Sequence, residues 1–280
     1  MRLFVFGLGY SAGVLAGRLR AQGWHVGGTG RGGTMAFADS AAVQAELAAA
    51  SHVLSSVPPG RDGIDPVLAH YGPALRAALP ARWIGYLSST GVYGDCGGAW
   101  VDETAPVGQG RRSARSDADL AWQALGARVF RLPGIYGPGR SAFDRLQSGT
   151  ARRLIAPGQV FSRVHVDDIA GGVIAGLNGP VGVYNIADDE PCDGNAVIEE
   201  AARLMGVAPP PLVPLELADL SPMARAFYAE NRRVANGKAR RVLGWKPLFP
   251  TYREGLRDLS ATISPISDSA APPTLNADQR

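Results

Sequence analysis

The chain has 280 residues, of which 46% are hydrophobic, and a formal net charge of +3. This apolar content supports a full hydrophobic core and excludes an intrinsically disordered protein. Arginine supplies most of the positive charge, since Lys238 and Lys246 are the only lysines. Because the basic residues are scattered and not interleaved with aromatic ones, the sequence does not indicate a nucleic-acid partner.

The two cysteines, Cys96 and Cys192, are far apart and lack CxxC spacing. This pattern predicts neither a disulfide framework nor a metal site, and it fits a reducing cytoplasm. The N-terminal apolar run to Ala16 imitates a secretory signal, but three glycines break it, and no other segment is long and apolar enough to span a membrane. We therefore expect a cytoplasmic protein with no membrane partner.

The first predicted strand, residues 2–6, runs into a glycine-rich turn and then a helix that reaches about residue 22. Gly7 permits the tight turn, Gly9 lets a pyrophosphate approach the backbone, and Ala12 allows close packing of the helix on the strand. Unpaired N–H groups and the macrodipole favour an anion at the start of a helix. An ordinary strand, turn and helix is the alternative. The turn predicts dinucleotide binding by the residues Gly7, Leu8, Gly9, Tyr10, Ser11 and Ala12.

A second predicted strand, residues 24–29, ends in Thr29 and continues into Gly30 and Arg31. NAD-binding proteins of this type carry an acidic residue near this position, which hydrogen-bonds the ribose 2′-hydroxyl. Arg31 instead favours NADP, because its guanidinium can pair with a 2′-phosphate. A solvated loop arginine with NAD as the cofactor is the alternative. We take Thr29 and Arg31 as candidate cofactor residues.

Further strand-like runs at 52–57, 83–88 and 127–132 alternate with helical segments at 64–79 and 113–125. This alternation predicts an α/β fold of Rossmann type, a doubly wound parallel sheet with helices on both faces. Ligands bind beyond the carboxyl ends of the strands in such sheets. The residues that follow the third and fourth strands are therefore further cofactor candidates, namely Ser56, Val57, Pro58 and Ser88.

Beyond residue 140 the alternation loosens. A helix near 169–177, a strand at 183–186, a helix at 195–205 and a proline-rich connection at 209–211 predict a small C-terminal substrate lobe. We expect this lobe to be formed mainly by about residues 140–260 and to cap the sheet within one NAD(P)-binding domain, residues 1–262. Residues 263–280 lack periodicity and predict a disordered tail.

Six segments in order along residues 1–260 carry a more specific pattern, and they lie at 87–94, 103–106, 131–139, 164–170, 236–247 and 252–256. The first reads Leu-Ser-Ser-Thr-Gly-Val-Tyr-Gly, and the third reads Arg-Leu-Pro-Gly-Ile-Tyr-Gly-Pro-Gly. Together they resemble the extended branch of the short-chain dehydrogenase/reductase superfamily, the NAD-dependent epimerases and dehydratases. The resemblance implies a hydroxyl at Ser89 that polarises a substrate oxygen. It also implies that Pro133 and Tyr136 line the nicotinamide side of the pocket. A turn-stabilising serine and ordinary loop packing are the alternatives.

The chain departs from this family at the Tyr-x-x-x-Lys pair that exchanges the proton during hydride transfer. Arg111 stands at the tyrosine position and Arg115 at the lysine position. The resemblance implies that Arg115 holds the nicotinamide ribose. Arg111 cannot act as the acid/base, because a guanidinium does not release its proton, but it could bind an anionic substrate. The alternative is a solvated helix face on which these arginines pair with Asp117 or Asp119.

Another group must then exchange the proton. Tyr93 is the first candidate, Tyr136 is the second and solvent is the third, and an unperturbed tyrosine would need strong tuning of its pKa. His165 is more easily explained as a core histidine bonded to backbone. Asp167 and Asp168 are expected to cap the helix that they precede.

Dehydratases of this family carry Asp-Glu directly after the polarising hydroxyl residue, and this chain has Thr90-Gly91 there. The pattern therefore resembles the atypical subgroup that keeps the cofactor fold without the usual active-site residues. We expect an NAD(P)-dependent oxidoreductase or epimerase-like protein that acts on a small-molecule substrate. The alternative is a catalytically inactive NADP-binding sensor. The resemblance also implies a homodimer through helices that border the active site, including the helix near 113–125.

Overall fold

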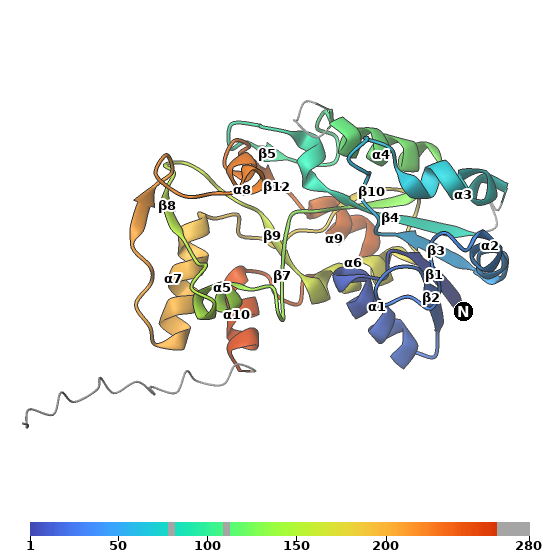
Figure 1. The fold of residues 1–280 in the computed structure, drawn as a ribbon, viewed down its shortest axis with the longest axis horizontal. Coiled ribbons are helices and arrows are strands. Elements are labelled where there is room, and N and C mark those ends of the chain that lie inside the picture. Colours follow the sequence, from blue (N-terminus) through green and yellow to red (C-terminus); the bar gives the residue numbers. More distant parts are fainter. Residues whose placement is uncertain (78–81, 109–112, 262–280) are drawn as a thin grey trace, which may run out of the picture.

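The computed structural model describes residues 1–77, 82–108 and 113–261 (Figure 1). A six-stranded parallel sheet lies at its centre, in the order β2-β1-β3-β4-β6-β10. Because β1 has β2 on one side and β3 on the other, the strand order reverses at β1, and the ligand crevice of such a sheet lies at the carboxyl ends of these strands. The strands are β1 (Arg2–Phe6), β2 (His25–Gly28), β3 (His52–Ser55), β4 (Trp83–Ser89), β6 (Arg128–Leu132) and β10 (Gly182–Asn185).

Helices cover both faces of this sheet (Figure 1). One face holds α1 (Tyr10–Ala21), α6 (Val166–Gly176) and α9 (Gly237–Leu243), and their buried side chains join a core that contains Leu15, Ile169 and Trp245. The opposite face holds α2 (Ser40–Ala49), α3 (Pro66–Ala77) and α4 (Ser113–Ala124), whose core contains Tyr71 and Trp122. The predicted Rossmann-type α/β fold is confirmed.

Two elements that we assigned to the small lobe belong to the main sheet instead. β10 pairs in parallel with β6, and α6 packs beside α1, where Arg18 forms an ion pair with Asp167. The expectation was wrong because the alternation of strands and helices resumes after an insertion near residue 140. The helix α2 was not predicted, since its alanine-rich sequence buries only Val43 and Leu47.

A second lobe packs at the carboxyl end of the sheet. Its own core surrounds Phe143, Val197 and Leu256 from α5 (Ala142–Gln147), α7 (Gly194–Met205) and α10 (Tyr252–Ser260). Capping boxes begin α5 at Ser141 and α10 at Thr251. The lobe also holds α8 (Pro222–Phe227) and the paired strands β8 (Arg153–Ile155) and β11 (Leu212–Pro214).

Two further strand pairs connect the sheet with the lobe, as Figure 1 shows. These are β7 (Gly134–Tyr136) with β9 (Arg163–His165), and β5 (Trp100–Val101) with β12 (Arg233–Val234). A short 3-10 helix, η1 (Thr90–Tyr93), follows β4 directly. Within the described ranges, no helix has the length and apolar character needed to cross a bilayer. The tail predicted for residues 263–280 lies outside the described residues.

Candidate active site

One cavity of about 1880 Å³ extends from the carboxyl ends of β1 and β3 into the second lobe. It brings together most of the candidates from the sequence, namely Gly7, Leu8, Gly9, Tyr10, Ser11, Arg31, Ser56, Val57, Pro58, Ser88, Ser89, Arg115, Pro133 and Tyr136. Three described candidates, Ala12, Thr29 and Tyr93, are not part of its lining. Arg111 lies outside the described residues.

The glycine-rich turn after β1 is held tightly by its neighbours. Gly7 has a φ of +81°, and a Cβ added there would lie 2.8 Å from Cγ2 of Val57. The Gly7 N–H donates to Oγ1 of Thr29 at 3.3 Å, and the Leu8 N–H donates to the Thr29 carbonyl at 2.6 Å. Ser56 Oγ donates to the Gly7 carbonyl at 2.5 Å. Thr29 therefore supports the turn from behind and does not reach the cavity.

The start of α1 presents free backbone donors to the cavity. Its N-cap residue, Gly9, has no side chain to cap the helix. Among the described residues, no acceptor receives the N–H groups of Tyr10, Ser11 and Ala12. Ala12 itself is buried between helix and sheet. Unpaired N–H groups at the positive end of a helix macrodipole form a donor set that fits a diphosphate.

Arg31 lies beside this turn. The loop that carries it packs on Leu8, because a Cβ added at Gly30 or Gly32 would lie 3.0 Å from the Leu8 backbone. Arg31 itself is exposed, lines the cavity and forms no ion pair with a described residue. A guanidinium in this state is free to bind an anion.

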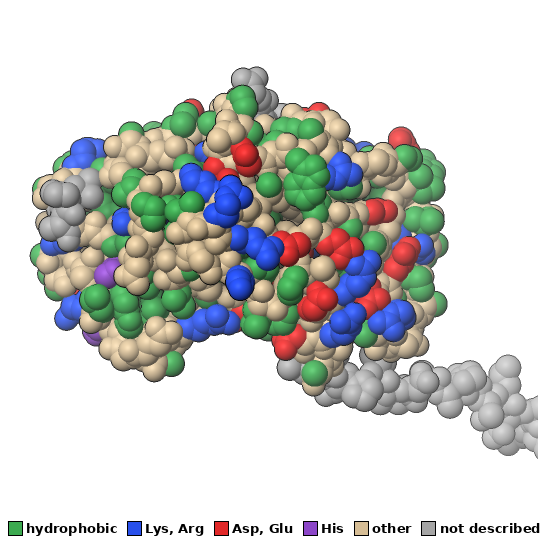
Figure 2. All heavy atoms as spheres, turned by 180° about the vertical axis from the view of Figure 1, so that it is seen from behind, with side chains coloured by type: hydrophobic (Ala, Val, Ile, Leu, Met, Phe, Trp, Pro, Cys, Tyr) green, Lys and Arg blue, Asp and Glu red, His purple; other side chains and the backbone are tan. Residues whose placement is uncertain are grey.

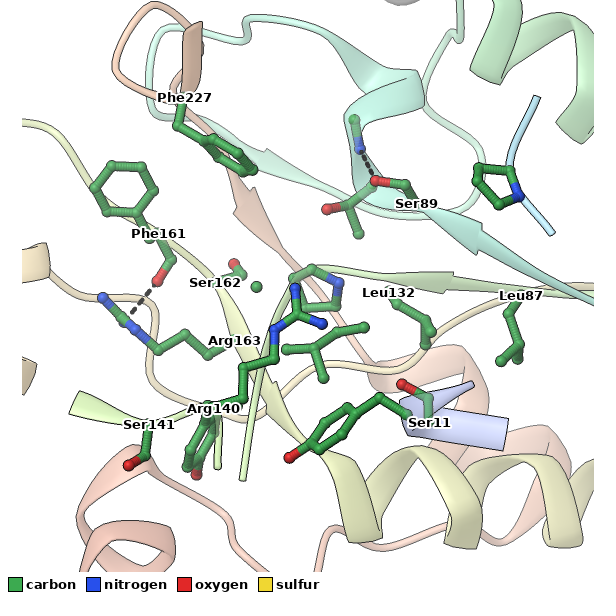
Figure 3. A pocket seen from close by; sticks show the side chains of 18 of the residues that line it. Ser11, Leu87, Ser89, Leu132, Arg140, Ser141, Phe161, Ser162, Arg163 and Phe227 are labelled. Carbon is green, nitrogen blue, oxygen red and sulfur yellow. Dashed lines mark hydrogen bonds between the residues drawn. The ribbon is translucent and has the colours of Figure 1, made fainter. Parts of the chain in front are cut away.

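Ser89 lies at the end of β4 with its hydroxyl beside the cavity (Figure 3). Its Oγ accepts a hydrogen bond from the Gly91 N–H at 3.1 Å. The alternative in which Ser89 stabilises the turn is therefore correct for the hydrogen bond that its oxygen accepts. The hydroxyl proton has no acceptor among the described residues, so Ser89 can still donate to a ligand.

A buried polar network lies behind the cavity wall. Asp119 accepts hydrogen bonds from Ser88 Oγ at 2.5 Å and from Nη2 of Arg131 at 2.7 Å. Nη1 of Arg131 donates to the Tyr93 hydroxyl at 3.0 Å, and this hydroxyl donates to Oδ1 of Asn185 at 2.8 Å. The network joins β4, β6, β10, α4 and η1 beneath the site.

This network corrects the first candidate for proton exchange. Tyr93 is only 2% exposed, and its hydroxyl is fully engaged by Arg131 and Asn185. Burial raises the pKa of Tyr93, although Arg131 opposes the shift. The hydroxyl is therefore not positioned to exchange a proton with a molecule in the cavity, because the side chain points into the core.

Arg115 is half-buried and lines the cavity. The alternative in which it pairs with Asp119 is wrong, because that carboxylate is already bound by Ser88, Gln123 and Arg131. Nor does Arg115 form an ion pair with any other acid in the part of the chain that the structure describes. Burial raises the pKa of the nearby Tyr86 hydroxyl and the Arg115 guanidinium opposes this shift, so Arg115 lies beside a neutral partner and keeps its charge for a ligand.

Tyr136 places its ring on the cavity, but its hydroxyl points toward α10. A Cβ added at Gly255 would lie 2.1 Å from this hydroxyl, which is buried and has no hydrogen-bond partner among the described residues. Burial raises the pKa of Tyr136. The second candidate for proton exchange is therefore also turned away from the cavity.

His165 is a buried core histidine bonded to backbone, as expected. Its Nδ1 accepts from the Asp167 N–H at 3.3 Å, and its ring packs edge-on against Tyr136 and Phe249. His165 is thus the residue that caps α6. The expectation that Asp167 and Asp168 cap this helix is wrong, because Asp167 pairs with Arg18 and Asp168 accepts from the backbone at residues 248 and 249.

The far end of the cavity holds functional candidates that the sequence analysis missed. Arg163 is fixed there by donating to the Phe161 carbonyl at 2.9 Å, and Arg232 pairs with Glu230 at 3.0 Å. These residues come from several short segments without a motif, so no sequence signal joined them. The missed set, labelled in part in Figure 3, is Arg140, Ser141, Arg145, Arg152, Phe161, Ser162, Arg163, Phe227, Tyr228 and Arg232.

No protein-family profile matches the sequence. A 3-diazoavenalumate denitrifying reductase from Streptomyces sp is 32% identical over 160 residues, which are 52% of this chain and 51% of the relative. The chain thus spans about half the length of this relative. Protein YeeZ of Escherichia coli K12 is 29% identical over 247 residues, which cover 75% of this chain and 85% of that protein.

Solved structures show the same architecture. A conserved protein of unknown function from Silicibacter pomeroyi DSS is 45% identical, with a TM-score of 0.84 over 93% of this chain and 98% of its own. The human epimerase family protein SDR39U1, solved with NADPH, is 18% identical, with a TM-score of 0.72 over 94% and 100%. The dTDP-glucose 4,6-dehydratase DesIV of Streptomyces venezuelae, solved with NAD, is 18% identical, with a TM-score of 0.73 over 93% and 96%. The last two likenesses establish the fold.

Proposed function

We propose that the chain is an NADP-dependent oxidoreductase of the short-chain dehydrogenase/reductase superfamily, which its motifs resemble and whose fold it shares. Its small-molecule substrate lies beside Ser89. The observation that carries this proposal is the continuation of the cavity past Ser89 into the second lobe. Aromatic residues that could fill this space do not, since Tyr93 is engaged in the buried network and Trp100 is 59% exposed.

The residues of this chain divide the work of binding and orientation. When bound, the nicotinamide supplies or accepts a hydride. The backbone at the start of α1 holds the diphosphate, and Arg115 orients the adjacent ribose. The Gly91 N–H fixes the oxygen of Ser89, and the Ser89 hydroxyl donates a hydrogen bond to the substrate oxygen on which negative charge develops.

Water supplies the proton that accompanies hydride transfer in this proposal. The hydroxyls of Tyr93 and Tyr136 are both turned away from the cavity. Arginine does not release its proton at any working pH, so Arg115 cannot replace them. The cavity is wide enough to admit solvent beside Ser89.

Arg31 supports NADP over NAD. It lies beside the glycine turn, lines the cavity and has no acidic partner among the described residues. A 2′-phosphate would supply that partner. The NADPH in the human structure and the reductase activity named for the Streptomyces relative support the same choice. NAD is the alternative.

The sensor alternative is less well supported by the geometry. A protein that only senses the cofactor needs neither a cavity beyond the nicotinamide nor a hydroxyl left free to donate, and this chain has both.

The free thiols Cys96 and Cys192 fit the reducing cytoplasm as its location. The homodimer through the helix near 113–125 stays a prediction.

The test is NADPH oxidation with a panel of small aldehydes, ketones and keto acids. We expect Ser89→Ala to lower kcat about 100-fold with NADPH affinity unchanged, because it removes a donor used in the transition state. Ser89→Thr keeps the hydroxyl and should recover much of the rate. Ser260→Ala, at the end of α10 and outside the cavity lining, is the matched control. Turnover that is unchanged in Ser89→Ala would contradict the proposal.

A further inference from the structure

Acidic side chains neutralise many arginines on the outside of the second lobe. Arg203 pairs with Glu200 at 2.8 Å, and Arg153 pairs with Glu199 at 2.5 Å. In the back view of Figure 2, positive and negative side chains are interspersed over the right half of the molecule, which carries the second lobe. The outer surface there is therefore close to electrostatic balance.

The cavity differs from the outer surface of the lobe, because most of its lining arginines have no acidic partner among the described residues. Asp144 and Glu230 are the acids in its described lining, and both are engaged. Asp144 accepts from the Ser141 N–H at 2.7 Å, and Glu230 pairs with Arg232. The lining arginines without an ion pair to any described residue are Arg31, Arg115, Arg140, Arg145, Arg152 and Arg163.

Two of these arginines line the part of the cavity that the second lobe forms, away from the cofactor turn. Arg145 lies on α5 and Arg163 on β9. Arg145 is exposed to solvent, and partial desolvation lowers its pKa, as does the positive charge of Arg163. Neither guanidinium forms an ion pair with a described residue, and a bound anion would offset the positive charge that the two bring to this end of the cavity.

Backbone carbonyls hold Arg163 in place, and aromatic rings border this end of the cavity. Arg163 donates to the carbonyls of Phe161, Cys192 and Asp193 at 2.9, 3.4 and 3.3 Å, which leaves no carboxylate on it. The ring of Phe161 packs edge-on against the ring of Tyr228, with 5.3 Å between the two ring centroids. Phe161 and Phe227 both border the cavity near Arg163 (Figure 3). A cationic end next to an apolar wall matches a ligand with an apolar body and an anionic end.

We propose that Arg145 and Arg163 form an anion-binding subsite for the substrate. The substrate class is an organic acid with an apolar or aromatic body, whose carboxylate or phosphate binds this pair while its reacting carbon lies near Ser89. This inference rests on the proposed function for the position of the reacting carbon. Two guanidinium forks can each bind two oxygens of either anion.

Calorimetric titration of the full chain with matched acid and neutral probes tests this subsite. Cinnamate is compared with cinnamyl alcohol, and phenyl phosphate with phenol, each with and without NADPH. We expect at least one acid to bind more than tenfold tighter than its neutral match. Whichever acid shows the larger gap identifies the anionic group. The proposal is overturned if neither acid binds more tightly than its neutral match.

Variants locate the binding. Arg145→Met keeps the length of the side chain without its charge, and we expect it to weaken binding of the acid at least tenfold. Because Arg145 makes no ion pair among the described residues, this variant should keep the thermal midpoint of the wild type. Arg163→Lys keeps a charge without the fork and should weaken the acid less. Arg203→Met, outside the cavity, is the control and should bind as the wild type does.

The design separates this proposal from the proposed function. A failure of NADPH to bind would contradict the oxidoreductase assignment, whereas the titrations without cofactor would still measure the subsite. Acid binding that is unchanged in Arg145→Met and lost in Arg31→Met would place the anion at the cofactor turn and overturn the subsite.

Discussion

The two ends of the cavity bind by different means. At the cofactor end, backbone N–H groups after β1 make the site, and Gly7 and Thr29 fix their geometry. At the far end, side chains such as Arg145 and Arg163 make the site, and they come from α5 and β9. The difference teaches that the shared chemistry of a diphosphate is held by backbone, which tolerates little change. The substrate is selected by side chains, which can be exchanged without altering the fold.

We expect the largest effect from a substitution in the buried network, which lies behind the cavity wall between the two ends. Arg131 and Asp119 form an ion pair whose side chains are 3% and 0% exposed. We expect Arg131→Met to lower the free energy of unfolding by about 3–5 kcal/mol, because Asp119 keeps a buried charge without its cation. Urea denaturation measures this change. A loss as small as that of Arg203→Met, whose ion pair is exposed, would show that the network does not stabilise the wall of the cavity.

A substitution in the glycine turn should break the cofactor end alone. Gly7→Ala places a Cβ 2.8 Å from Val57 at a φ of +81°. We expect NADPH affinity to fall about 100-fold, or roughly 2.7 kcal/mol, because the donors at the start of α1 shift. Cinnamate binding at the far end should persist.

Gly17→Ala is the control for the glycine turn. Gly17 lies in α1, the helix that follows the turn, and a Cβ added there meets nothing within 4 Å. We expect it to leave NADPH binding unchanged and to stabilise the protein by about 0.5–1 kcal/mol, because alanine is the better helix former. Equal NADPH affinity in both variants would refute the geometry of the turn.

The buried carboxyl of Asp188 lies close enough to Arg163 at the far end for the arginine to affect its pKa. Burial raises the pKa of Asp188 to about 8, although Arg163 opposes the shift. An unfolded aspartate titrates near pH 4, so the folded chain binds the extra proton between about pH 4 and 8 and loses stability as pH rises through that window. We expect Asp188→Asn to be more stable than the wild type at pH 8 by at least about 1.4 kcal/mol, the equivalent of one pKa unit.

Thermal or urea unfolding across this pH range checks the prediction for Asp188. The gap between the variant and the wild type should narrow as pH falls and close below about pH 4, where the carboxyl is protonated in both states. A constant gap would show that ionisation of Asp188 does not oppose folding.

The sequence was most informative where function requires a particular backbone. Gly7, Gly9 and Arg31 were predicted from the strand, turn and helix, and the structure places all three on the cavity. The parallel sheet was predicted from alternation alone. Both signals are local, because they depend on residues close together in the chain.

Orientation and long-range contacts were beyond local patterns. Tyr93 belongs to a recognisable motif, but Asn185 and Arg131 from other strands turn its hydroxyl into the core. The residues Arg145 and Arg163 line one cavity only because a second lobe packs at the end of the sheet. Neither outcome leaves a trace in residue spacing, since both depend on the tertiary structure.

Calorimetry with NADPH and NADH tests the central claim most directly. We predict that the wild type binds NADPH about tenfold tighter than NADH, a difference of roughly 1.4 kcal/mol, because Arg31 pairs with the 2′-phosphate. Arg31→Met should remove this preference and leave NADH binding unchanged. If the pure protein takes up neither cofactor, the glycine turn is not a dinucleotide site and the account is contradicted.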